Sequence, residues 1–135
     1  MRLLISTIVL TFLISCSEVG TNKLEEKEET IELTYIAWAC ACANWAPIEE
    51  IEKHPGISGD SLADLCIYIE HADKSPALPD TICASGDIIK LTGKFYKEKG
   101  LPKDVRLIEN PDKARVFRYT NYEIVKSNYS YFLKE

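Results

Sequence analysis

The 135-residue sequence has few of the side chains and motifs on which most enzymes depend. It holds only two histidines, His54 and His71, and no His-Glu pair at the spacing of a metal site. It has no glycine-rich phosphate loop, and no serine or cysteine stands in a nucleophile motif. There is also no internal repeat and no long amphipathic helix. We therefore expect a protein that is not an enzyme, with no cofactor and no metal ion.

No apolar run reaches the length of about 20 residues that a membrane-spanning helix needs. The longest runs from Leu3 to Ile14, follows the basic Arg2, and ends at Ser15-Cys16. A basic residue, a short apolar segment and a small residue before the cleavage point are the parts of a secretory signal. We expect a signal peptide over residues 1–15; an ordinary secretory signal or a buried helix are the alternatives.

Leu13-Ile14-Ser15-Cys16 resembles the lipobox of bacterial lipoproteins. The resemblance implies that the Cys16 thiol receives a diacylglyceryl group and becomes the mature N-terminus, held to the membrane by its acyl chains. It places the protein in the cell envelope. Because Ser17 rather than Asp follows the cysteine, the resemblance favours the outer membrane.

Residues 16–30 lack aromatic side chains and are rich in glutamate. Such a segment cannot form a core, so we expect a flexible acidic tether, with a short charged helix over 24–32 as the alternative. Residues 31–135 have the length of one small domain.

Four cysteines remain if Cys16 carries the lipid: Cys40, Cys42, Cys66 and Cys83. An even number in an exported chain predicts disulfides. On a strand, residues two apart face the same way, so Cys40 and Cys42 would each bridge to Cys66 or Cys83 rather than to each other. The alternative is that the four thiols bind copper or zinc or act in thiol redox chemistry.

The apolar pattern predicts strands over 31–38, 65–71, 87–96 and 113–125, and one short helix over 48–53. Gly93 inside the clearest strand predicts a bulge or sharp bend. The fold class is therefore mostly β, a small, bent, antiparallel sheet or barrel with one short helix. The stretch from Gly86 to Phe95 resembles the central strand of OB-fold domains, which implies an OB-like barrel. The whole chain resembles the small, functionally uncharacterised lipoproteins of Bacteroidetes-type bacteria, from which no activity carries over.

Two further patterns are candidate sites. Asp60-Ser61-Leu62 and Asp80-Thr81-Ile82 match the O-glycosylation triplet of those bacteria, which implies modification of Ser61 and Thr81; ordinary turn or cap residues are the alternative. The later strands carry a mixed basic and aromatic set that we expect on one outward binding face: Lys90, Lys94, Tyr96, Arg118 and Tyr119. Aromatic and basic groups can stack on bases or sugars. An acidic chain in the envelope disfavours nucleic acid as a partner.

The sequence as a whole indicates a lipid-anchored envelope protein with a non-catalytic binding domain. Its partner would be another envelope protein or a glycan. The competing hypothesis is a metal-binding or thiol-redox lipoprotein that uses the four cysteines.

Overall fold

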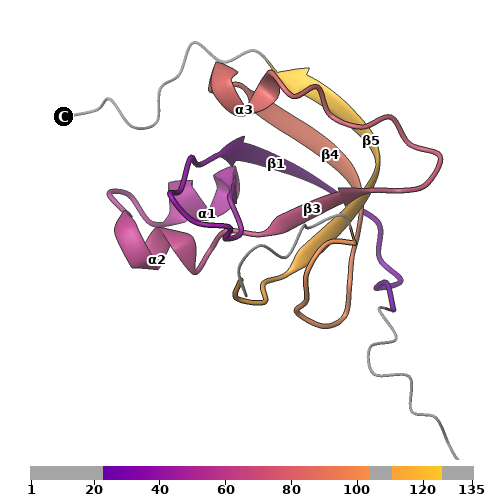
Figure 1. Ribbon diagram of the computed structural model, residues 1–135, viewed down its shortest axis with the longest axis horizontal. Coiled ribbons are helices and arrows are strands. Elements are labelled where there is room, and N and C mark those ends of the chain that lie inside the picture. The colour runs from indigo at the N-terminus through magenta and orange to yellow at the C-terminus, as the bar shows by residue number, and fades with distance from the viewer. Residues whose placement is uncertain (1–22, 104–110, 126–135) are drawn as a thin grey trace, which may run out of the picture.

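The computed structural model describes residues 23–103 and 111–125 of the chain (Figure 1). Cys16 and the expected signal peptide lie outside the described residues. The elements are five strands and three short helices, in the order β1 (Glu29–Tyr35), β2 (Trp45–Pro47), α1 (Ile48–Lys53), α2 (Gly59–Ala63), β3 (Tyr68–His71), α3 (Ile82–Ser85), β4 (Ile88–Phe95) and β5 (Val116–Val125).

The five strands form one curled sheet in the order β2-β1-β4-β5-β3. All neighbouring strands are antiparallel except β3 and β5, which are parallel. The two ends of this order meet, because Trp45 in β2 and Ile67, just before β3, exchange backbone hydrogen bonds of 3.3 and 2.9 Å. The expected small, bent, β-rich fold is therefore confirmed. It differs in its one parallel pair and in having three short helices instead of one.

The alternation of apolar and polar residues follows the two faces of the sheet. On β4, Leu91 and Phe95 are buried in the inner core, together with Leu33 of β1 and Phe117 of β5. A second apolar cluster covers part of the outer face, where Leu62 of α2 packs with side chains from the strands. Because both faces are partly covered, outward-pointing residues of this sheet are not necessarily exposed.

Gly93 stands where the backbone of β5 leaves no room for a side chain on β4. The register between the two strands shifts between Thr92 and Gly93, as expected for a bulge. A Cβ atom on Gly93 would lie only 2.1 Å from the carbonyl oxygen of Arg118 and 2.7 Å from the Cα atom of Tyr119. The predicted bulge is confirmed, and its cause is the close approach of the neighbouring backbone.

The domain begins earlier than residue 31. The Glu25 N–H donates to the Phe95 carbonyl at 2.8 Å, and the Lys97 N–H donates to the Lys23 carbonyl at 2.8 Å. Leu24 packs on the outer apolar cluster, and β1 already starts at Glu29. Residues 23–30 are therefore part of the domain and not of a free tether. Composition missed this because the segment is held mainly by backbone hydrogen bonds, which do not depend on side-chain type.

Within the described residues, no helix combines the length and the apolar character needed to cross a membrane.

Candidate functional site

The cysteines pair differently from the expectation. Cys40 and Cys42 are bonded to each other, with their Cα atoms 5.3 Å apart, while Cys66 and Cys83 are free. The reason is local: β1 ends at Tyr35, and residues 39–42 lie in a bend rather than a strand. The two side chains therefore do not share a strand face, and the bend brings the sulfurs together.

The two free thiols lie in different places and are not activated. The buried Cys66 donates to the Leu62 carbonyl at 3.4 Å. Burial raises the pKa of the Cys66 thiol, and the indole of Trp38 partly opposes this rise. In the described structure, the buried N–H of that indole has no hydrogen-bond partner of ordinary geometry. Burial and the nearby Asp80 raise the pKa of the exposed Cys83. Both thiols are therefore protonated at neutral pH, and neither has the thiolate character of a nucleophile.

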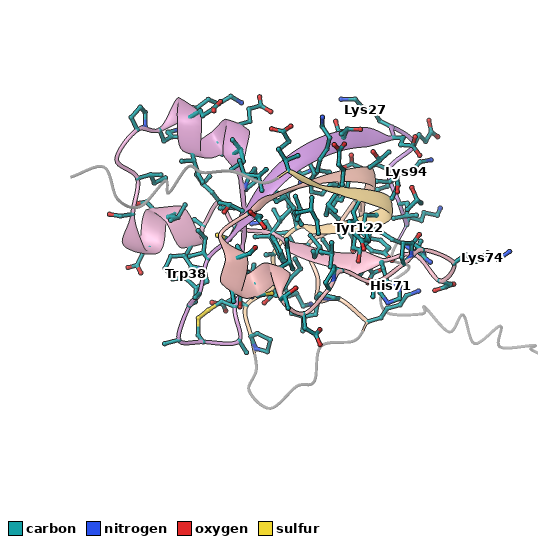
Figure 2. All side chains as sticks on the ribbon, turned by 90° about the horizontal axis from the view of Figure 1, so that it is seen from above. Lys27, Trp38, His71, Lys74, Lys94 and Tyr122 are labelled. Atoms are coloured by element: carbon teal, nitrogen blue, oxygen red, sulfur yellow. A yellow bond between two sulfur atoms is a disulfide. The ribbon has the colours of Figure 1, made fainter. Side chains whose placement is uncertain are left out.

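The four cysteines do not form one cluster. Across residues 23–103 and 111–125, no group of three or more His, Cys, Asp or Glu side chains is placed to hold a metal ion. Figure 2 shows the disulfide at the same end of the molecule as Trp38, whereas His71 lies at the opposite end.

The five residues of the expected binding face are not exposed together. Tyr96 and Tyr119 are buried, with exposed fractions of 6% and 3%, so their rings cannot serve as stacking platforms. Tyr119 also belongs to the inner core, whereas its neighbour Arg118 points to the other side of the sheet. This prediction was wrong because the second apolar cluster covers Tyr96, while Tyr119 points into the inner core.

The lysines of that set are half-buried and lie among acids. The Lys90 ammonium is 3.7 Å from the Glu32 carboxylate, and Glu123 is its cross-strand neighbour on β5. Lys94 is paired across the strands with Arg118, beside Glu70 on β3. The charges on this face of the sheet therefore largely balance.

Arg118 and Tyr96 instead belong to a buried polar cluster around Glu70. The Tyr96 hydroxyl donates to one carboxylate oxygen of Glu70, and the Lys103 N–H donates to the other at 3.1 Å. Arg118 lies 3.9 Å from the same carboxylate and 3.3 Å from Asp73. Burial, followed by the hydrogen bond to Glu70, raises the pKa of Tyr96 to about 12. With its acceptors satisfied, this cluster ties the chain after β4 to β3 and is structural.

An apolar cavity of about 280 Å³ lies where β3 and β5 meet the segment leading into α3. Its wall is formed largely by Trp45, Ile69, Leu78, Ile82 and Tyr119. The Tyr119 hydroxyl accepts a hydrogen bond from the Leu78 N–H at 3.2 Å, which holds the connecting segment over the end of the barrel. Burial raises the pKa of Tyr119, so this hydroxyl stays neutral. The volume is just below the range of about 300–1,000 Å³ typical of small-molecule sites, so the cavity can hold one side chain or one sugar ring.

A few polar groups stand at the edge of this cavity. The ring of His71 is 6.5 Å from that of Tyr119, and its Nδ1 lies 3.2 Å from the Ala72 carbonyl. In the neutral form Nδ1 therefore carries the proton, which leaves Nε2 as an acceptor. Asp80 and Cys83 also line the rim. An apolar wall with few polar groups is the usual composition of a binding site.

Sequence reasoning missed this cavity. The available signal was the apolar Ala77-Leu78 pair between Pro76 and Pro79, which is unusual in an exposed loop. What could not be read from sequence is that this loop lies against Tyr119, 41 positions further along the chain.

A second cavity of about 270 Å³ is lined by charges of both signs. The acids are Glu50 and Asp64, and the bases are Lys99 and Arg115. The Arg115 guanidinium stacks on the Phe95 ring at 3.7 Å. Because this arginine already has an aromatic partner and a carboxylate 3.8 Å away, that of Glu25, we regard this cavity as the weaker candidate.

The two candidate glycosylation residues are both exposed: Ser61 lies within α2, and Thr81 directly precedes α3. No protein family, curated protein or solved structure matches this chain, so the site must be interpreted from its own chemistry.

Proposed function

We propose that this chain is a lipid-anchored protein of the cell envelope, located in the outer membrane, whose barrel binds a partner without catalysis. The observation that carries the binding role is the apolar cavity beside α3, with its few polar groups at the rim. Its size suits one apolar or aromatic group of a larger partner, such as a side chain of another envelope protein or a sugar ring of a glycan.

The anchor is supported by the lipobox resemblance at Leu13-Ile14-Ser15-Cys16. A diacylated cysteine carries two long chains, which is enough for stable attachment to a bilayer. The test is Cys16→Ser, followed by detergent partitioning of labelled cells. The variant should stay unprocessed or leave the membrane fraction. If it still enters the detergent phase at the mature mass, the anchor proposal is wrong.

The cavity is tested by filling it. Ala77 lines it, whereas Ala84 is exposed on α3 and does not. In NMR titrations with envelope peptides and oligosaccharides, a true ligand should shift the resonances of Ile69 and Tyr119. Ala77→Phe should abolish those shifts, and Ala84→Phe should leave them unchanged. If both variants bind like the original protein, the cavity is not the binding site.

Thiol redox chemistry is the second candidate, and the Cys40–Cys42 disulfide favours it. The bond closes a loop over one residue, and the Ile36 N–H already donates to the Asn44 carbonyl at 2.8 Å across the same connection. Since the stabilisation that a disulfide gives rises with loop length, this bond adds little to the fold. Cys40 is also exposed, as exchangeable disulfides commonly are.

The corresponding step is a thiol–disulfide exchange with a dithiol. One thiolate of the dithiol attacks a sulfur of the Cys40–Cys42 bond, which breaks and leaves a mixed disulfide. The second thiol of the dithiol then displaces it. The dithiol is oxidised by two electrons, and Cys40 and Cys42 become thiols. Incubation with dithiothreitol should reduce this bond with little change in the melting temperature. A large fall in melting temperature would instead show that the bond is structural.

The exposure of Ser61 and Thr81 supports O-glycosylation as a proposal for these sites. Mass spectrometry of the native protein tests it, because Ser61→Ala or Thr81→Ala should each remove one glycan mass.

A further inference from the structure

β3 is an end strand of the sheet, and its outer edge is only partly paired. On the inner side, the N–H groups of Tyr68 and Ala72 both donate at 2.9 Å to carbonyl groups in or next to β5. Main-chain groups alternate in direction along a strand, so those of Ile67, Ile69 and His71 point away from β5. These three residues form the outer edge.

Only the first of the three has a partner in the described structure. Ile67 exchanges hydrogen bonds of 2.9 and 3.3 Å with Trp45 of β2. β2 follows β3 no further, because the carbonyl group of the residue before Trp45 accepts the Ile36 N–H at 2.8 Å instead. Within residues 23–103 and 111–125, the main-chain N–H and carbonyl groups of Ile69 and His71 form no hydrogen bond. The edge therefore offers two donors and two acceptors to another chain.

The apolar cavity lies beside this free edge. Trp45, Ile69 and His71 line it, together with the loop over residues 77–80. The Ile69 side chain packs on the inner core, and the His71 ring is 6.5 Å from that of Tyr119, which belongs to the same core. A strand that paired with these residues would place every second side chain on the same inner face.

Trp45 already uses the edge in this way. It pairs with Ile67, and its side chain is buried in the inner core. A residue added opposite Ile69 would continue this row, and its side chain would point towards the cavity. The cavity volume of about 280 Å³ has room for one such side chain.

We propose that the partner of this domain is an extended peptide segment, which adds to the free edge of β3 and places one apolar side chain in the cavity. This inference rests on the proposed binding role of the cavity and names the chemistry of the partner. Hydrogen bonds to Ile69 and His71 supply affinity that does not depend on the peptide sequence, and the cavity selects the apolar side chain. A sugar ring has no alternating N–H and carbonyl groups, so this edge favours a polypeptide over a glycan.

The first measurement needs no ligand. In amide hydrogen exchange of the mature protein, followed by NMR, Ile69 and His71 should exchange at least about tenfold faster than Tyr68 and Ala72. The last two are the matched controls, because they are neighbours in the chain and their N–H groups are hydrogen-bonded. Equal protection of all four amides would show that the edge is already covered and would overturn the inference.

The probes for binding are short synthetic peptides in which threonine alternates with one apolar residue: valine, leucine, phenylalanine, tyrosine or tryptophan. At least one should bind and slow the exchange of Ile69 and His71 about tenfold or more, with Tyr68 and Ala72 unchanged. If no peptide binds, the inference is overturned.

N-methylated peptides then test the main-chain hydrogen bonds. Methylation of one alternating set of peptide residues removes the donors that face β3 and should weaken binding by up to about tenfold for each lost hydrogen bond. Methylation of the other set should have little effect. The sensitive set also reports whether the added strand is parallel or antiparallel to β3. Equal sensitivity of both sets, or of neither, would overturn the added strand.

The cavity variants separate this inference from the proposed function. If Ala77→Phe blocks binding and Ala84→Phe does not, but Ile69 and His71 stay unprotected, the cavity remains the binding site and the added strand is overturned. Binding of oligosaccharides alone, blocked by Ala77→Phe, would likewise keep the cavity and overturn the peptide partner. A peptide that protects Ile69 and His71 equally well in Ala77→Phe would overturn the placement of its side chain in the cavity.

Discussion

Removing one hydroxyl from the buried polar cluster should destabilise the whole domain. The Tyr96 hydroxyl donates to Glu70, whose side chain is 5% exposed. Tyr96→Phe removes this donor without leaving a large cavity. The carboxylate keeps the Lys103 N–H at 3.1 Å, and Arg118 at 3.9 Å, but loses its closest partner.

The magnitude follows from the charge of the acceptor. A hydrogen bond to an ionised group contributes about 1.5–3 kcal/mol, and water cannot easily replace the lost donor at this burial. We expect Tyr96→Phe to lower the free energy of unfolding by about 2 kcal/mol at pH 8. Tyr122→Phe is the matched control, because Tyr122 is half-buried in the same sheet, and we expect a change below about 0.5 kcal/mol.

The effect should also depend on pH. A tyrosine in the unfolded chain loses its proton near pH 10, while Tyr96 in the folded protein keeps it until about pH 12. The stabilisation due to the raised pKa is therefore complete below pH 10 and is lost as the pH rises towards 12. At pH 11 the free energy of unfolding of the original protein should be lower by about 1 kcal/mol because of this group. Tyr96→Phe has no hydroxyl at this position, so its free energy of unfolding should not fall in this way.

Urea unfolding at pH 8 and at pH 11, monitored by circular dichroism, measures both effects. The difference between the original protein and Tyr96→Phe should shrink from about 2 to about 1 kcal/mol. A difference below about 0.5 kcal/mol at pH 8, or one that does not change with pH, would refute the role given to this hydrogen bond.

Three other perturbations test the fold and the sulfur chemistry. Gly93→Ala should lower the free energy of unfolding in urea by about 2 kcal/mol or more, because the new methyl group meets the backbone of β5. Gly100→Ala has free space around the new methyl group and should leave the free energy of unfolding nearly unchanged. Equal effects of the two substitutions would contradict the bulge. The native mature protein should have a mass about 2 Da below its reduced form, since one disulfide removes two hydrogens. A mass difference of about 4 Da would instead indicate two disulfides and contradict the single bond between Cys40 and Cys42. Iodoacetamide should modify Cys83 in the folded protein, and Cys66 only after unfolding. Leu24→Ser should lower the free energy of unfolding by about 1 kcal/mol, and an unchanged melting curve would show that the first described segment does not pack on the domain.

Local patterns were enough to predict several elements. The period-2 alternation over 87–96 predicted β4, and the proline and acids around Ile48 predicted α1 with its observed bounds. Gly93 predicted the bulge, because a glycine inside a well-formed strand needs a steric reason. These features depend on neighbouring residues, and their physical cause lies within a few positions along the chain.

Contacts between distant segments were beyond such patterns. The bend at 39–42 decides that Cys40 bonds to Cys42, and the second apolar cluster decides that Tyr96 is buried on a face expected to be exposed. The cavity exists only because the loop around Leu78 reaches Tyr119. The sequence by itself determined four of the five strands, though not β2, together with the bulge and the expectation of an anchor at Cys16. Tertiary structure alone decided which thiols meet, which aromatic rings are covered and where the chain enters the domain, because each depends on segments brought together by folding.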